Sequence, residues 1–169
     1  AIKFHRVGGR SFASARLNRE YMPDDGHCPW LIASKKSAER EYLALTSLHP
    51  AVSVPLPIDQ NRHTVVMSLV NGQNLNRCRL DEPGTVLDEI LENVQKAYRA
   101  GIIHADLSEY NILMDDGKCV LIDWPQWMET GHQNAQTILE RDIDNILAYF
   151  LRKYKLVYDR EDAIRCVTG

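Results

Sequence analysis

The sequence predicts a single domain of the α+β class. Its 169 residues, 44% of which are hydrophobic, are enough to bury one core. Strand-like patterns come early in the chain, and the longest helical patterns come later. A strong hairpin signal, Asp-Asp-Gly-Lys at 115–118, joins two short apolar runs between the later helical patterns. The chain contains no internal repeat or low-complexity tract that would favour another architecture.

The first half of the chain is expected to form two strands, one helix and one long loop. Alternation of apolar and polar residues indicates the strands, and apolar residues three or four positions apart indicate the helix. The loop contains Gly8, Gly9 and other turn residues without any sustained period. The expected elements are a strand at 1–6, a mobile loop at 7–30, a helix from Ser34 or Ser37 to about Leu48, and a strand at 63–70.

The second half is expected to be mainly helical, with one hairpin. Gly101 is expected to end the first helix, because glycine readily adopts the left-handed conformation of a helix C-terminus. The expected elements are a helix at about 84–100, a loop at 103–111, strands at 112–114 and 119–122, and helices at about 134–153 and 159–167.

The charge balance excludes a protein that binds nucleic acid through overall positive charge. Twenty Lys and Arg residues stand against 23 Asp and Glu residues, for a formal net charge of -3. Two local basic patches are candidates for contact with RNA, although solvated helix faces explain such patches more often. They comprise Lys35, Lys36 and Arg40, and Arg152, Lys153 and Lys155.

Neither a membrane segment nor a zinc or disulfide framework is expected. No apolar run approaches the ~20 residues that a membrane span needs, and the four cysteines form no CxxC pair. Free thiols and the lack of a signal peptide predict a cytoplasmic protein without a membrane partner. The chain begins without Met, inside a strand pattern, so a fragment of a longer protein is expected.

The strongest chemical signal is His-Ala-Asp-Leu-Ser-Glu-Tyr-Asn at 104–111, followed by Asp123. Phosphoryl transfer needs a carboxylate beside the incoming nucleophile and oxygen ligands for a divalent metal. Asp106 and Asn111 lie in the expected loop, and Asp123 ends the return strand of the hairpin, so we expect the three side chains to meet. Each residue alone is more simply a turn former or a helix cap. Their combined order predicts a phosphoryl-transfer site.

Two upstream residues fit the same chemistry. Lys3 lies in Ala-Ile-Lys, which is close to the strand motif whose Lys reaches the phosphates of a nucleotide. Glu41 lies on the following helix, where a carboxylate would pair with that Lys, and Glu39 is its rival. Residues 67–70 precede a turn signal, where a hinge would offer backbone groups to adenine. Ordinary solvated side chains and a buried strand end are the simpler alternatives for each feature alone.

The sequence resembles the RIO family of atypical serine/threonine protein kinases over nearly its whole length. The segment at 104–111 and Ile-Asp-Trp-Pro-Gln at 122–126 carry the resemblance, together with residues 1–8 and 61–67. The Asp-Trp-Pro-Gln and Lys-Phe-His-Arg segments resemble the second RIO subfamily, whose full-length members carry an N-terminal winged helix. The segment at 104–111 is equally typical of the first subfamily.

The resemblance implies a bilobal, protein-kinase-like fold with a truncated small lobe and a minimal helical large lobe. The rest of the small lobe and the hinge would occupy residues 1–70, and the large lobe would occupy residues 71–169. The implied cofactors are ATP and Mg²⁺, with Mn²⁺ as an alternative metal. The implied partner is a precursor of the small ribosomal subunit, made of rRNA and protein, whose maturation the family supports. The oligomeric state stays open.

The functional residues of the family map onto matching positions of this sequence. The resemblance implies that Asp106 is the catalytic aspartate and that Asn111 and Asp123 hold the metal. It also implies that Asp123 forms an aspartyl phosphate. The residues implied in nucleotide binding are Lys3, Glu41, Met67, Ser68, Val70, Leu113 and Ile122.

Three departures from ordinary protein kinases are visible. Ser108 stands where those enzymes place a Lys after the catalytic Asp. Trp124-Pro125 replaces Phe-Gly and predicts a stiff turn that holds Asp123 in place, because proline fixes its own φ and restricts the residue before it. A glycine-rich loop is missing before Lys3.

Two other functions remain open at this point. A small-molecule kinase of the aminoglycoside or choline type shares the His-x-Asp and the later Asp, but it would need far more than the 46 residues that follow Asp123. A non-catalytic module with a kinase fold could instead dock on ribosome precursors. ATP would raise the thermal stability of an enzyme and leave that of such a module unchanged.

Overall fold

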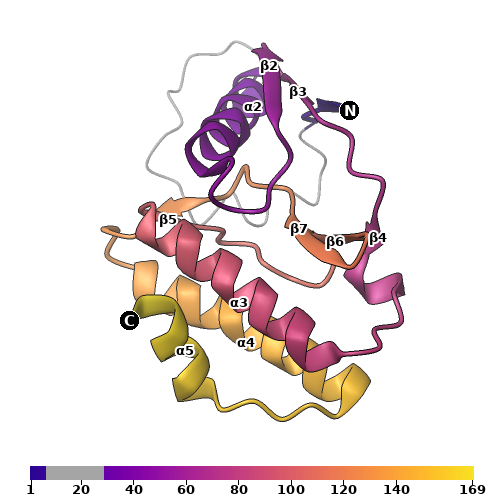
Figure 1. Cartoon of the computed structure of the whole chain (residues 1–169). Coiled ribbons are helices and arrows are strands. Elements are labelled where there is room, and N and C mark those ends of the chain that lie inside the picture. Colours follow the sequence, from indigo (N-terminus) through magenta and orange to yellow (C-terminus); the bar gives the residue numbers. More distant parts are fainter. Residues whose placement is uncertain (7–28) are drawn as a thin grey trace.

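The computed structural model of the chain describes residues 1–6 and 29–169. Residues 7–28 of the predicted loop at 7–30, with Gly8 and Gly9, lie outside the described residues, and the last two residues of that loop instead begin a helix. In the rest of the chain the α+β class is confirmed, with a small sheet and one helix at one end and three helices at the other (Figure 1). The helices are α2 (Pro29–Leu48), α3 (Pro83–Arg99), α4 (Ala135–Tyr154) and α5 (Arg160–Thr168).

The first sheet is antiparallel and has the strand order β1-β3-β2. Its strands are β1 (Ile2–Phe4), β2 (Pro57–Asn61) and β3 (Thr64–Met67). Lys3 lies opposite Val65 in the ladder, and α2 packs against β2 and β3. Strand β3 has buried apolar residues at alternate positions, Val65 and Met67, because α2 packs against the sheet.

This part differs from the prediction in several places, and the strands expected at 1–6 and 63–70 are shorter than predicted. Strand β2 was not predicted, because Pro57 and the polar residues after it lack the alternation of a half-buried strand. It forms as an edge strand on β3, where backbone pairing replaces a hydrophobic pattern. Helix α2 begins at Pro29, ahead of the expected caps Ser34 and Ser37. Proline is favoured in the first turn of a helix, where its missing N–H costs no hydrogen bond.

The hairpin and the later helices follow the predicted pattern closely. Strands β6 (Ile112–Asp115) and β7 (Lys118–Leu121) pair antiparallel, and β4 (Gln73–Asn74) adds to β6. At the turn, Asp116 and Gly117 both have positive φ, of 47° and 79°, as a two-residue hairpin turn requires. Gly101 has a φ of 84° just after α3, so the expected stop is confirmed.

The remaining elements connect these parts. A 3₁₀ turn η2 (Leu75–Arg77) follows β4, and the short strands β5 (Ile102–Ile103) and β8 (Met128–Glu129) pair with each other. Helix α5 packs on α3 and α4, and Asp159 caps its start by accepting a hydrogen bond from the backbone N–H of Asp162. No helix among residues 1–6 and 29–169 is both long and apolar enough to cross a bilayer.

Candidate active site

Three charged residues from separate elements meet where the small sheet, α2 and the end of the hairpin come together. The Nζ of Lys3 on β1 lies 2.7 Å from Oε1 of Glu41 on α2 and 2.6 Å from Oδ1 of Asp123 after β7. These distances are those of charge-assisted hydrogen bonds. The predicted pair of Lys3 with Glu41 is therefore present, and Asp123 joins it.

Glu41 rather than Glu39 is the inward carboxylate of α2. The side chain of Glu41 is 2% exposed, whereas that of Glu39 is 51% exposed and contacts Lys35 at 3.6 Å along the same helix. His5 Nε2 donates to Oε2 of Glu41 at 2.6 Å, and the backbone N–H of Trp124 lies 3.3 Å from Oε1. Burial by itself would raise the pKa of Glu41, but the contacts from His5 and Lys3 outweigh it and lower the pKa.

The loop at 104–111 is held to the hairpin by backbone and amide groups. The side chain of Asn111 donates through Nδ2 to the backbone carbonyl of Asp106 at 2.8 Å. The backbone carbonyl of Asn111 accepts from the N–H of Ile122 at 3.0 Å. Ala105 and Asp123 both have left-handed φ values, of 64° and 68°. Such values are costly for residues other than glycine, and they cluster at functional sites.

Asp106 and Asp123 interact electrostatically where the loop at 104–111 lies beside the end of the hairpin. Burial raises the pKa of Asp106, and the negative charge of Asp123 raises it further, against the opposing effects of Arg141 and Asn111. A cation placed beside these two carboxylates would stabilise the charge of Asp106, so the site favours a cation.

The side-chain oxygen atoms of Asn111 and Asp123 fit a divalent ion that also binds phosphate. Nδ2 of Asn111 is used within the loop, and its Oδ1 accepts no hydrogen bond from the part of the chain that the structure describes. The same holds for Oδ2 of Asp123, since Lys3 contacts Oδ1. The described residues contain no cluster of three His, Cys, Asp or Glu side chains that could bind a metal alone. An ion here would therefore take its further ligands from water and from a nucleotide, as Mg²⁺ commonly does.

Helix α4 braces the loop through residues that the sequence analysis did not identify. Arg141 donates to the backbone carbonyl of Ala105 at 2.6 Å, and Asn145 donates to that of Leu107 at 3.2 Å. Between them lies Asp142, with a side chain that is 1% exposed and a pKa raised to about 6 by burial. Arg141 and the backbone N–H groups of Ala105 and Leu107 favour its charged form and limit that rise.

His104 is a structural member of the loop. Its Nε2 lies 3.0 Å from the backbone carbonyl of Ile122, so Nε2 carries the proton, and its ring lies 4.4 Å from that of Trp124. Burial lowers the pKa of His104 to about 4. The imidazole is therefore neutral at neutral pH, and its contacts fix the loop against the residue that follows Asp123.

The comparisons with known proteins identify the family of the chain. Residues 1–163 match the RIO domain. The chain belongs to the RIO family. A RIO-type serine/threonine-protein kinase Rio2 of Methanocaldococcus jannaschii is 44% identical over 95% of this chain and 61% of its own length. The serine/threonine-protein kinase RIO2 of Caenorhabditis elegans is 35% identical over 95% of this chain and 31% of its own length.

The second RIO subfamily fits best among these relatives. A RIO-type serine/threonine-protein kinase Rio1 of Haloferax volcanii is 32% identical, below the value for the archaeal Rio2. A solved Rio2 kinase of Chaetomium thermophilum, described as an ADP/Mg²⁺-phosphoaspartate complex, superposes with a TM-score of 0.75 at 26% identity, over 98% of this chain and 52% of the other. The predicted kinase-like fold is thereby confirmed. The RIO domain described here spans about one third to two thirds of the length of these relatives.

Residues 67–70, which are predicted to form the hinge, contain two backbone groups without a hydrogen bond among the described residues. The N–H of Met67 donates to the carbonyl of Ala1 at 3.0 Å, and the N–H of Ser68 donates to that of Leu56 at 2.8 Å. Within the described residues, no hydrogen bond uses the carbonyl of Ser68 or the N–H of Val70. An acceptor and a donor two residues apart match the edge of an adenine ring, which offers both an amine and ring nitrogens.

Three cations of the two basic patches contact other groups of the chain. Arg40 turns to the loop after Asp123, where its Nε donates to the carbonyl of Pro125 at 3.0 Å. Arg152 pairs with Glu109 at 2.8 Å, and Lys153 donates to three backbone carbonyls that include that of Cys78. Arg40, Arg152 and Lys153 thus have partners within the chain, and contact of these patches with RNA stays a prediction.

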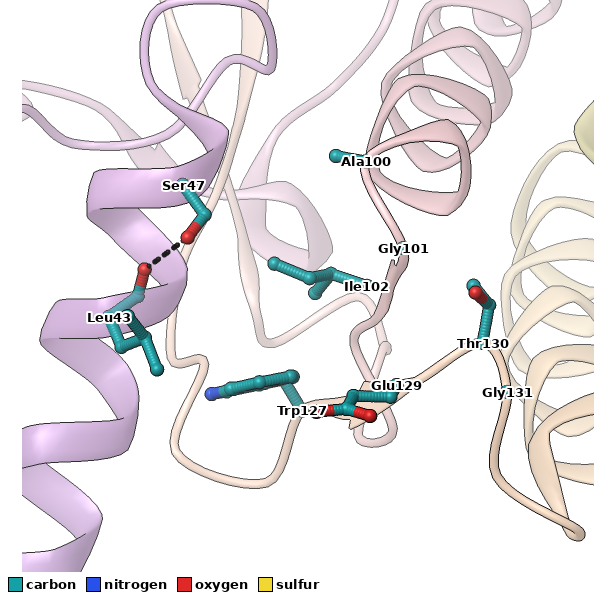
Figure 2. A pocket seen from close by; sticks show the side chains of 9 residues that line it. All are labelled: Leu43, Ser47, Ala100, Gly101, Ile102, Trp127, Glu129, Thr130 and Gly131. Carbon is teal, nitrogen blue, oxygen red and sulfur yellow. Dashed lines mark hydrogen bonds between the residues drawn. The ribbon is translucent and has the colours of Figure 1, made fainter.

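We call the set of Lys3, Glu41 and Asp123 the charged cluster. A pocket of about 420 Å³ lies away from this cluster, and none of the three residues lines it (Figure 2). Leu43 and Ser47 of α2 form one wall, and Trp127 with the segments at 100–102 and 129–131 forms the others. No residue predicted for the active site lines it. The candidate active site of this RIO domain is the charged cluster and not this pocket.

Proposed function

We propose that this RIO domain transfers a phosphoryl group from ATP with the help of Mg²⁺, as an atypical serine/threonine kinase or ATPase. The observation that carries the proposal is the meeting of Lys3, Glu41 and Asp123 beside the loop that holds Asp106 and Asn111. A phosphoryl-transfer site needs a phosphate-binding cation, metal ligands and a positioned carboxylate, and this cluster contains all three. The kinase names of relatives that share family and fold support it.

Asp106 is the catalytic aspartate of the proposal. Its carboxyl group is only partly buried, on a loop fixed by Asn111 and braced by Arg141. The raised pKa of Asp106 makes its carboxylate a better proton acceptor for an incoming hydroxyl group. Its role is to position and deprotonate the nucleophile, which affects turnover more than nucleotide affinity.

Asn111 and Asp123 would hold the metal, through the oxygen atoms left unused in the structure. Bound Mg²⁺, or Mn²⁺ in its place, supplies charge neutralisation for the phosphates. Lys3, oriented by Glu41, would contact the phosphates, and Asp123 is the residue proposed to accept the phosphoryl group. The phosphoaspartate in the description of the Chaetomium thermophilum structure supports this assignment.

The adenine would bind at the hinge. The free carbonyl of Ser68 and the free N–H of Val70 are the proposed polar contacts, and Met67 is the buried residue before them. Leu113 and Ile122 are half-buried on the hairpin and its exit and would line the nucleotide from the large lobe. The division into a small lobe at 1–70 and a large lobe at 71–169 belongs to this proposal.

The replacement Asp106→Asn tests the proposal. We expect turnover of ATP by the full-length protein to fall about 10²- to 10⁴-fold, with the affinity for ADP–Mg²⁺ kept within a few-fold. Asp116→Asn, in the exposed hairpin turn, is the matched control and should behave like wild type. Unchanged turnover in Asp106→Asn would refute the assignment of the catalytic residue.

The biological setting of the proposal is maturation of the small ribosomal subunit in the cytoplasm. Membership of the RIO family and similarity to Rio2 kinases support it. The proposed partner is a precursor particle of rRNA and protein. Co-sedimentation of the tagged full-length protein with small-subunit precursors tests this part, and its absence from those fractions at low and moderate salt would count against it.

A further inference from the structure

Arg40 on α2 and Trp127 on the loop after Asp123 hold each other through reciprocal contacts. The indole N–H of Trp127 donates to the backbone carbonyl of Arg40 at 2.9 Å. In return, the guanidinium of Arg40 donates to the carbonyls of Pro125 and Trp127 and lies 4.7 Å from the centre of the Trp127 ring. Figure 2 shows the Trp127 indole pointing its nitrogen toward α2. We call this set of contacts the Arg40–Trp127 clasp.

Each half of the clasp is close in sequence to a residue of the charged cluster. Arg40 directly precedes Glu41 on α2, and Pro125 follows Asp123 by two residues. Among the described residues, the other contacts between these two segments belong to the cluster itself, namely the 3.3 Å approach of the Trp124 N–H to Glu41 and the bridge through Lys3. Within the described part of the chain, the clasp thus connects α2 to this loop without the charged side chains of Lys3, Glu41 or Asp123.

Arginine suits this task in a way that lysine does not. Its planar guanidinium presents several donors in a fixed fork and stacks on an aromatic ring at the same time. Arg40 uses both properties, with two carbonyls of the loop and one indole face. Trp127 is 9% exposed and Arg40 is half-buried, so much of the clasp is shielded from water.

We propose that Arg40 is a positioning residue, which holds α2 against the 123–127 loop so that Lys3 can meet both Glu41 and Asp123. This inference deepens the proposed function and rests on it. Arg40 does not contact the cluster directly. It acts by keeping Glu41 and Asp123 at the separation that one Lys side chain can bridge, with 2.7 and 2.6 Å contacts.

The test compares Arg40→Lys with a matched arginine that has no link to the cluster. Arg160 also forms a multiple contact, with Glu140 and Asp144, but it joins α5 to α4. Calorimetry of ADP–Mg²⁺ binding to the full-length protein is the measurement, at a temperature where every variant is folded. We expect Arg40→Lys to weaken binding about tenfold, and Arg160→Lys to bind like wild type.

A second background separates positioning from general loss of stability. In Lys3→Met the bridge is already absent, so Arg40→Lys should weaken binding no further there. Equal losses in both backgrounds, or wild-type affinity in Arg40→Lys, would overturn the inference. If Arg40→Lys does not fold, Trp127→Phe removes the indole N–H, keeps the ring and is expected to lose affinity in the same direction. Failure of the wild type to bind ADP–Mg²⁺ would instead refute the proposed function.

Discussion

Replacing Glu41 with Gln removes one buried negative charge without changing the size of the side chain. The carboxylate accepts from Lys3 at 2.7 Å and from His5 at 2.6 Å, and a hydrogen bond to a charged group contributes about 1.5–3 kcal/mol. The Lys3 side chain is 34% exposed, so water screens its contribution toward the lower limit. We therefore expect the free energy of unfolding to fall by about 3 kcal/mol, or the Tm by about 6–12 °C.

Denaturant unfolding followed by circular dichroism measures this loss, with Glu39→Gln as the control on the same helix. Glu39 makes one exposed contact, so its replacement should cost less than ~0.5 kcal/mol. Because the pKa of Glu41 is lowered in the folded state, its contribution is present above the ordinary pKa of 4.5 and is lost as the pH falls through the folded value. Equal effects of the two replacements at neutral pH would refute the buried-cluster argument.

Two further predictions concern Asp142, which lies beneath the loop at 104–111, and Gly72, which lies close to the backbone of Met114. Burial raises the pKa of Asp142 to about 6 and lowers that of His104 to about 4. Between pH 4 and 6, Asp142 therefore binds a proton more strongly in the folded protein than in the unfolded protein, and His104 binds one less strongly. Asp142→Asn leaves the effect of His104 unopposed, so its free energy of unfolding should rise more steeply with pH than that of wild type between pH 4 and 6. The difference in slope should reach about 1.4 kcal/mol per pH unit, and parallel curves would contradict this. A Cβ on Gly72 would lie 2.5 Å from the backbone oxygen of Met114, so Gly72→Ala should destabilise the protein by about 1–3 kcal/mol. Gly84 on α3 faces open space, so Gly84→Ala should instead stabilise by up to ~1 kcal/mol, and the same sign for both in thermal unfolding would contradict the packing argument.

The parts of the fold that could be predicted are those with a strong local pattern. The Asp-Asp-Gly-Lys turn, the apolar face of α3 and the stop at Gly101 all depend on neighbouring residues, and all are present. Strand β2 could not be predicted, because its pairing partner β3 and not its own sequence determines it.

The candidate site was predictable where a family pattern fixes the spacing. Lys3 and Glu41 form the expected pair, but the buried His5 beside it and the left-handed φ of Asp123 depend on tertiary contacts. Asp142 had one usable signal, because it occupies a position in the apolar stripe of α4, between Leu139 and Ile143. A charged residue at such a position indicates a buried carboxylate with a partner.

The Arg40–Trp127 clasp could not be predicted from the sequence. The position of Arg40 after Lys35 and Lys36 indicated a solvated basic face. Its partner lies 87 residues away in a loop without regular structure, and no local periodicity relates the two. Contacts of this kind emerge only when α2 and the loop are placed together.

Mapping the phosphoenzyme tests the central claim, which is that the Lys3–Asp123 cluster faces the reacting phosphate of ATP. The full-length protein is incubated with labelled ATP and Mg²⁺ and divided into two halves. One half is treated with hydroxylamine, which releases the phosphate of an acyl phosphate, and both halves are then digested with trypsin. The tryptic peptide 119–141 contains Asp123 as its only Asp, and it is separate from the peptide 100–118 that contains Asp106. The account predicts a hydroxylamine-labile label on 119–141. A label that resists hydroxylamine and lies only on Ser or Thr residues would contradict it.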